Sequence, residues 1–322
     1  MNTTSKSAFV ACILMSTSVV AGETNNASRF EVSVQTDIQR AWQPETIYML
    51  DDVAGSRAKT NETMTLAGVG VAIGYSLPED TFLSNSFFGD RPSVQFSGKY
   101  MTGNSTSSHF DGGANANSNL NLDGSRGLQW ANGTWASDNQ IDVAQFSAFI
   151  KGSHEENTWS FAPSIGVLFT DYSQTYDLNS AFSSANRNVL DASLDADLYG
   201  LSFGGEIKSP SFSGYRISVM SNIKSYVADT DLSATQDKDQ NINLFNTLSL
   251  QDDETSGVYE GELGVRVEKS FGAVDLSLGM KASAVYGMPY IHMPEALNDS
   301  ARIENDETSY AVSGDIRLTV HF

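Results

Sequence analysis

The end of the chain alternates apolar and polar side chains without a break from residue 310 to residue 322. One set of alternate positions holds Tyr310, Val312, Gly314, Ile316, Leu318, Val320 and Phe322. A period of two is the geometry of a β-strand, in which successive side chains point to opposite faces. The other set includes Asp315 and Arg317, so one face is apolar and the other charged. Such a strand needs two solvents, which lipid outside and a polar lumen inside supply.

Nine further segments show strand character, although some alternate less regularly. They are residues 30–36, 63–77, 93–102, 141–151, 158–172, 195–208, 215–227, 258–269 and 274–286. The segment 141–151 alternates poorly, because Val143 and Phe149 interrupt its polar face. Most of the segments are long enough for a tilted transmembrane strand, which takes about 9–11 residues.

The connections between these segments alternate in length. Three are short, at 152–157, 209–214 and 270–272, and the exception is 78–92. Five are long, at 41–61, 103–140, 173–188, 228–256 and 287–307. Short periplasmic turns with long external loops are typical of outer-membrane barrels. Tyrosines including Tyr172 and Tyr226 are expected to form an interfacial girdle at the external ends.

The pattern therefore predicts an all-β fold, an antiparallel up-and-down transmembrane β-barrel of ten strands. Twelve strands are the main alternative, because 82–88 and 244–250 also have some strand character. A soluble, secreted all-β protein is the competing fold.

The first residues have the features of a secretory signal peptide, namely Lys6, an apolar stretch at 9–20 and small residues after it. The predicted division is a signal peptide at 1–21, cleaved after Ala21 or Gly22, and one barrel domain at 22–322. The single cysteine, Cys12, lies inside the predicted signal peptide. Disulfides and thiolate chemistry are therefore not expected in the mature chain.

A terminal strand of this form, ending on Phe322, resembles the assembly signal of Gram-negative outer-membrane barrels. The resemblance implies location in the cell outer membrane. It also implies outer-membrane lipid, periplasmic chaperones and the barrel-assembly machinery as partners. These motifs define a sorting class rather than a family with one activity.

Charge and hydropathy narrow the class further. The chain has 19 basic and 39 acidic residues, a net charge of −20, and this leaves no basic footprint for nucleic acid. The acid is concentrated in 229–254 and 295–307, which are expected outside the membrane. No stretch after the signal peptide is apolar for 18 residues, which excludes helical membrane spans.

The polar faces of the predicted strands carry charged side chains of both signs, which are expected to share one lumen. They are Lys99, Glu206, Lys208, Arg216, Lys224, Glu260, Glu262, Arg266, Asp275, Lys281, Asp315 and Arg317. In a medium of low dielectric constant, opposite charges must pair and form hydrogen bonds. The pairs either fill a structural barrel or line a narrow pore for small solutes.

The sequence favours a non-catalytic barrel with no cofactor and no metal site. Ten-stranded barrels include the omptin proteases, but their rim pattern is not found, and His109 and His292 are interpreted as solvated loop residues. Residues 237–248 resemble the opening of a calcium loop, but Ile242 and Leu248 stand where Gly and Glu are required. A surface-binding barrel acting through acidic external loops is the alternative. Trp130 and Trp135, in the predicted loop 103–140, are interpreted as part of a lid over the mouth.

Overall fold

The computed structural model describes residues 30–43, 47–50, 57–59, 63–78, 81, 83, 86–89, 91–111, 117–130, 133–156, 158–183, 186–239, 246–294 and 298–322. The predicted signal peptide and its cleavage site lie outside these residues, so they stay predictions. Within the described residues, no helix has the length and apolarity that a membrane crossing requires.

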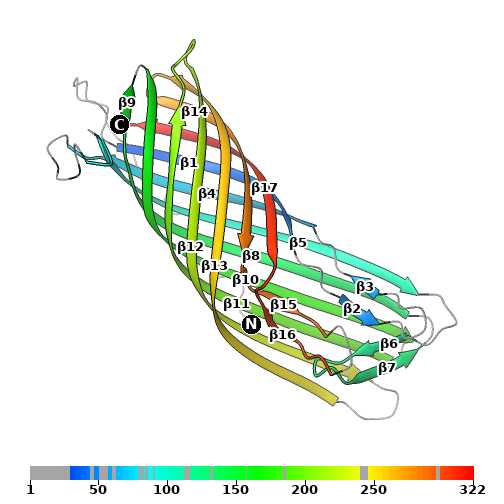
Figure 1. Cartoon of the computed structure of the whole chain (residues 1–322). Coiled ribbons are helices and arrows are strands. Elements are labelled where there is room, and N and C mark those ends of the chain that lie inside the picture. The colour runs from blue at the N-terminus through cyan, green and yellow to red at the C-terminus, as the bar shows by residue number, and fades with distance from the viewer. Residues whose placement is uncertain are drawn as a thin grey trace.

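Ten long antiparallel strands close into a barrel (Figure 1). They are β1 (Phe30–Trp42), β4 (Thr63–Ser76), β5 (Ser93–Asp111), β8 (Gly133–Lys151), β10 (Trp159–Ser183), β11 (Asn186–Lys208), β12 (Tyr215–Asp239), β13 (Asn246–Phe271), β14 (Val274–Tyr286) and β17 (Thr308–His321). Pairing of β17 with β1 joins the two ends of the sheet, and the Phe322 N–H donates to the Phe30 carbonyl at 2.8 Å. The predicted ten-stranded fold is confirmed.

The twelve-strand alternative is wrong. Residues 246–250 of the candidate segment 244–250 are the beginning of β13. In the candidate segment 82–88, the described residues form only an isolated bridge, from Ser86 to Gly89. The short strand β9 (His154–Glu156) pairs with β10 beside the turn that follows β8.

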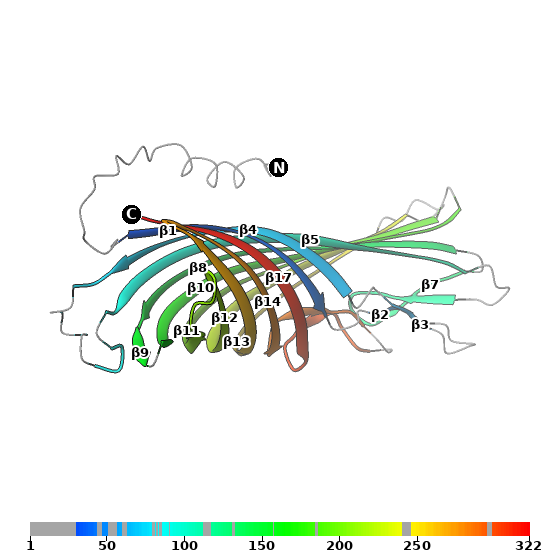
Figure 2. The ribbon, with the colours of Figure 1, turned by 90° about the horizontal axis from the view of Figure 1, so that it is seen from above.

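The two ends of the barrel differ, and we call them the short-turn end and the long-loop end. Both ends of the closed sheet, Phe30 and Phe322, lie at the short-turn end, as Figure 2 shows. At the long-loop end, β2 (Ile47–Leu50), β3 (Arg57–Lys59), β6 (Asn117–Leu120) and β7 (Arg126–Trp130) form a small second sheet. The hairpin of β15 (Tyr290–His292) and β16 (Arg302–Glu304) lies between β14 and β17 in the chain.

The barrel wall has an apolar outer face and a polar inner face. On β17, Ile316 is 53% exposed and Leu318 is 46% exposed, whereas Asp315 is only 5% exposed. The same outward exposure continues around the barrel at Ile38, Val69, Phe96, Phe146, Val167, Leu201, Ile223, Leu263 and Leu278. A continuous belt of exposed large apolar side chains is unusual on a soluble monomer and typical of a lipid-facing wall.

The strands β10 to β13 extend far into segments that the sequence suggested were loops. Each has 23 to 26 residues, so most of 173–188 and 228–256 is strand rather than loop. Much of 103–140 is also strand, in β5, β6, β7 and β8, which places His109, Trp130 and Trp135 in strands. The expectation of long irregular loops there is wrong.

The alternation of these extensions is inverted relative to the part of the wall with the apolar outer face. On β11, Leu194 and Ala196 are buried at 0% and 3%, whereas Asp195 and Asp197 between them are exposed. Polar outside and apolar inside is the pattern of a sheet in water around an apolar core. The chain therefore keeps a period of two, but its apolar side chains change from the outer face of the barrel to the inner face.

The inversion also explains two misplaced tyrosines. Tyr172 and Tyr226 are each 5% exposed and point into the barrel, so their expected place in an interfacial girdle is wrong. Tyr100, Tyr199, Tyr259, Tyr286 and Tyr310 do point outward, each with 38% or more of its surface exposed.

Candidate functional site: the barrel interior

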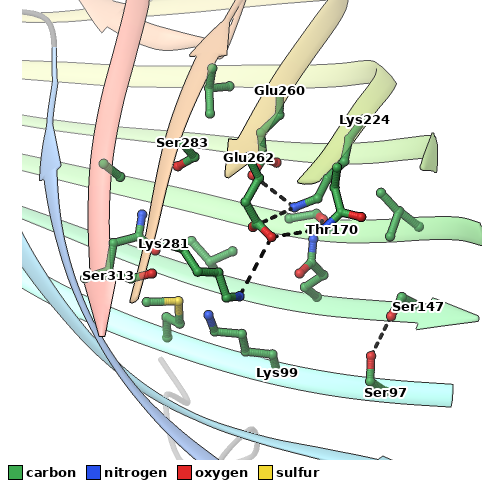
Figure 3. A pocket seen from close by; sticks show the side chains of 18 of the residues that line it. Ser97, Lys99, Ser147, Thr170, Lys224, Glu260, Glu262, Lys281, Ser283 and Ser313 are labelled. Atoms are coloured by element: carbon green, nitrogen blue, oxygen red, sulfur yellow. Dashed lines mark hydrogen bonds and ion pairs between the residues drawn. The ribbon is translucent and has the colours of Figure 1, made fainter. Parts of the chain in front are cut away.

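The interior of the barrel holds a network of ion pairs from six strands. The central cation is Lys224 on β12, whose Nζ lies 2.9 Å from Oε1 of Glu260 and 3.6 Å from Oε2 of Glu262, both on β13 (Figure 3). Glu262 also faces Lys281 of β14 at 3.9 Å. The pairs Lys99–Asp37 at 3.2 Å and Arg266–Asp315 at 3.5 Å bring in β5, β1 and β17.

The remaining predicted lumen residues lie toward the short-turn end. Glu206 pairs with Lys208 at 3.7 Å, and the Asp275 carboxylate is 2.7 Å from Nε2 of His321. Arg317 donates through Nε to the amide oxygen of Gln35 at 3.1 Å. Arg216 is exposed and lies opposite Glu268 in the sheet register. The structure thus brings most of the predicted charges together and leaves Arg216 outside the network.

Among the described residues, Asp37 and Lys151 are charged residues of the interior that the sequence prediction missed. Asp37 is 1% exposed, and it lies on a part of β1 beyond the predicted strand end at residue 36. The alternation from residue 37 to residue 42 was the signal that could have found it. Lys151 is the last residue of β8 and lines the interior, but the irregular alternation of that strand hid its face.

An internal cavity of about 400 Å³ lies within this network. Its charged lining comes from Lys99, Lys151, Lys224, Lys281, Arg266, Arg317, Glu206, Glu260 and Glu262. Its apolar lining includes Leu66, Met101, Ile141, Val143, Leu168, Tyr172, Leu198, Tyr226, Val258 and Val285. Val143 and Phe149, which interrupted the polar face of their segment, both line this cavity.

Two segments fold into the barrel at the long-loop end, and together we call them the cap. The cap consists of residues 121–125 and of the described residues in 288–305, which include β15 and β16. Its apolar side chains Leu122, Ile291, Met293, Ala301 and Ile303 are 2–5% exposed. They belong to one buried cluster with Tyr176, Leu194 and Leu232 of the strand extensions.

Inward-facing polar groups of β12 and β13 anchor the cap. Oε1 of Gln236 accepts the Leu122 N–H at 3.0 Å, and Oδ2 of Asp252 accepts the Ile303 N–H at 3.0 Å. Part of the acidic segment that the sequence placed in a solvated loop therefore holds the cap. The outward aspartates of the same strands, including Asp229 and Asp231, stay exposed.

His292 is the centre of a charged cluster on the β15–β16 hairpin. Its Nε2 lies 2.9 Å from Oδ2 of Asp299, and its Nδ1 lies 3.1 Å from Oε2 of Glu304. Arg302 forms ion pairs with both carboxylates. The His292 side chain is only 11% exposed, so its interpretation as a solvated loop histidine is wrong.

The pKa values around this cluster follow from its contacts. Burial raises the pKa of Tyr290, and its hydrogen bond to Glu304 raises it further. Partial burial lowers the pKa of Arg302, but the hydrogen bonds to Asp299 and Glu304 outweigh burial and the pKa is raised. The cluster is thus a closed set of mutually satisfied charges.

Comparisons with known proteins identify no family for this chain. No protein-family model matches the sequence, and no curated protein matches it. Among solved structures, the outer membrane protease OmpT from Escherichia coli is similar, with 10% identity, coverage of 94% of this chain and 99% of that chain, and a TM-score of 0.39. The fold is that of an outer-membrane β-barrel.

Two autotransporter domains are similar to this barrel at the same level. The translocator domain of NalP from Neisseria meningitidis has 10% identity and a TM-score of 0.41, with 91% of this chain and 89% of that chain covered. The transport unit of AIDA-I from Escherichia coli has 8% identity and a TM-score of 0.36, with 94% and 93% covered. These values concern the fold alone.

Proposed function

We propose that this chain is a non-catalytic barrel of the Gram-negative outer membrane, closed at its external end by its own cap, and therefore not an open porin-like pore. In this proposal the short-turn end faces the periplasm and the long-loop end faces outward. The observation that carries it is the buried apolar cluster of the cap, which fills the interior where a pore would open.

The outward belt of apolar side chains supports the membrane location. Ile316, Leu318 and their neighbours on the other strands would be exposed to water in a soluble protein. Lipid removes this cost, because apolar surface is stabilised by about 25 cal/mol for each Å² that leaves water. The inverted alternation beyond the belt fits strands that leave the bilayer and continue into water.

The ion pairs of the interior support a structural barrel rather than a wide channel. Lys224 faces two carboxylates, and Asp37 and Asp315 each face one cation from a buried position. The pairs join adjacent strands, as Lys224 of β12 and Glu260 of β13 do, or strands with one strand between them, as Lys99 of β5 and Asp37 of β1 do. Side chains that are held by such partners are not free charges lining a water-filled channel.

A rim hydrolase is the second candidate, because His292 contacts Asp299 at 2.9 Å. A general base needs a ring nitrogen directed at substrate or water, within hydrogen-bond reach. Both nitrogens of His292 already face carboxylates, and Arg302 occupies the same two carboxylates. This arrangement favours a structural clasp of the hairpin over catalysis.

Planar-bilayer recording of the purified full chain tests the proposal. A barrel closed by its cap gives no discrete conductance steps, whereas an open pore gives reproducible steps. Discrete steps from the unmodified protein would overturn the proposal.

A second measurement uses the absence of cysteine after Cys12. Ser283→Cys places a thiol in the cavity lining, and Thr255→Cys places one on the exposed outer face of β13. A membrane-impermeant maleimide applied from outside should modify position 255 rapidly and position 283 slowly. Adding Ile303→Asp, which buries a charge in the cap, should accelerate modification at position 283 only. Equal rates at both positions in the otherwise unmodified chain would show an open mouth.

A further inference from the structure

We infer that the cavity inside the barrel is a binding site for a single-chain amphiphile with an anionic headgroup. The inference rests on the proposed function, because a closed barrel can keep such a ligand apart from the surrounding lipid. It is carried by the order of side chains along the inner face of the strands and by the balance of charge around the cavity.

Several strands change from charged or polar to apolar side chains at corresponding places on the inner face. Toward the cap, Lys99 of β5 is followed by Met101, and Lys224 of β12 is followed by Tyr226. In the same direction Glu260 of β13 is followed by Val258. On β8 and β14 the change runs from Gln145 to Val143 and from Lys281 to Val285. The cavity therefore has a charged half and an apolar half, which is the complement of an amphiphile.

The charged half has an excess of cations, although the whole chain has a net charge of −20. Six cationic and three acidic side chains line the cavity, and Asp37 and Asp315 add two carboxylates through their pairs with Lys99 and Arg266. Among the described residues, neither Lys151 nor Arg317 has a carboxylate within 4.0 Å. Cations that face the cavity without a carboxylate partner favour an anion.

Lys99 and Lys281 mark where the headgroup binds. Figure 3 shows the two side chains extending toward one another from β5 and β14. Lys281 has only a long contact, 3.9 Å, with Glu262, and Glu262 lies closer to Lys224 at 3.6 Å. Of the three lysines that border the apolar half, Lys99, Lys224 and Lys281, Lys281 therefore has the longest contact with its carboxylate.

The size of the cavity restricts the ligand further. A volume of about 400 Å³ is near the lower end of small-molecule sites, which span roughly 300–1,000 Å³. One short alkyl chain with a small headgroup fits this volume, and a two-chain phospholipid does not. Medium-chain carboxylates are the ligand class that combines the apolar tail with the required charge.

Photolabelling with a dodecanoate that carries a diazirine on its tail tests the inference. The full chain is reconstituted in phosphatidylcholine liposomes, and the labelled residues are mapped by mass spectrometry. Inward and outward residues alternate on each strand, so Met101 reports the cavity while Tyr100 reports the surrounding lipid. Binding in the cavity labels Met101, Val143 and Val285 in addition to the outward residues.

The charge requirement is tested with two matched variants and a neutral probe. Lys281→Gln should lower labelling of Met101 and Val285 about tenfold, since it removes a charge-assisted hydrogen bond. Lys269→Gln should leave it unchanged, because Lys269 lies outside the cavity against the Tyr215 ring. The Lys281 variant should still fold, because Glu262 retains its ion pair with Lys224 at 3.6 Å and its hydrogen bond from Asn222 at 3.1 Å. Dodecanol with the same diazirine should label these inward residues about tenfold less than dodecanoate.

Labelling of the outward residues alone would overturn the inference and leave the membrane barrel intact. Equal inward labelling by the alcohol and the carboxylate would also overturn it, because the cavity would then not select charge. Discrete conductance steps from the same protein would overturn the closed barrel, and inward labelling would still support the site.

Discussion

Lys224 and Glu260 form the shortest ion pair at the centre of the barrel, with 2.9 Å between Nζ and Oε1. Their side chains are 12% and 17% exposed, and they join β12 to β13 in register. Removing one partner of such a pair leaves an uncompensated charge, which costs about 3–5 kcal/mol in buried sites. Substitution of this pair therefore tests directly whether ion pairs stabilise the interior.

Lys224→Met is expected to lower the free energy of unfolding by about 3 kcal/mol. The variant leaves both Glu260 and Glu262 without their shared cation. Adding Glu260→Gln should recover part of the loss, since it removes one of the two unpaired carboxylates. Urea titration in lipid vesicles, followed by heat-modifiable migration on gels, measures both changes. A double variant as unstable as the single one would contradict the ion-pair assignment.

Gly279→Ala is expected to destabilise the barrel by about 1–3 kcal/mol. Gly279 faces the interior on β14, and a Cβ added there would clash with Oδ1 of Asp315. Gly261→Ala is the matched control on the neighbouring strand, because an added Cβ would meet nothing within 4 Å. The two unfolding midpoints in urea should differ clearly. Equal midpoints would show that Asp315 does not lie against β14.

Asp177→Asn is expected to stabilise the protein slightly at neutral pH. Asp177 lies on β10 between Asp191 and Asp138 of the adjacent strands. Partial burial raises the pKa of Asp177, and the negative charge of Asp191 raises it further. A carboxyl with a raised pKa in the folded state favours folding when protonated and loses this contribution as the pH rises through that pKa.

The gain from Asp177→Asn should therefore vanish near pH 3 and be present at pH 7. Because the side chain is exposed, solvent screening limits the gain to about 0.5 kcal/mol. Asp237→Asn is the control, since that carboxylate accepts a hydrogen bond from Thr247 at 2.7 Å and should give no gain. Thermal unfolding at both pH values measures the effect, and a gain that persists at pH 3 would contradict it.

Arg302→Gln is expected to loosen the cap without unfolding the barrel. The substitution removes the ion pairs of Arg302 with Asp299 and Glu304 and keeps the contacts of both carboxylates with His292. Limited proteolysis of the reconstituted protein from the outside should then cleave within 287–307 faster than in the unmodified chain. Lys269→Gln, on the outer wall, should not change the rate. Unchanged cleavage in the Arg302 variant would show that the cluster does not hold the hairpin.

The sequence predicted the fold wherever the two faces of a strand have different solvents. Strand β17 is the clearest case, because every position from 310 to 322 agrees with lipid on one side and a polar interior on the other. The sequence also predicted that buried charges of opposite sign, such as Lys224 and Glu260, pair with one another, although it did not predict the partners. Which residues pair depends on register, and register comes from the closed sheet rather than from one strand.

Prediction from the sequence failed in the strand extensions, where the apolar side chains face inward and the polar ones face outward. Asp195 and Asp197 alternate with Leu194 and Ala196 as regularly as any membrane strand, but with the apolar side chains inward. A search for apolar residues facing outward therefore misread 228–256 and most of 173–188 as loops. The cap could not be predicted at all, because Leu122 and Ile303 belong to one buried cluster although they are far apart in the sequence.

The measurement that tests the account most directly is a cysteine scan of β17 with an environment-sensitive fluorophore. Single cysteines at 312, 316 and 318 should give blue-shifted emission that brominated lipid quenches. Cysteines at 313 and 319, on the inner face, should give emission that brominated lipid leaves unchanged. Alternation with this phase confirms a wall between lipid and a polar interior. Uniform quenching, or alternation with the opposite phase, would contradict it.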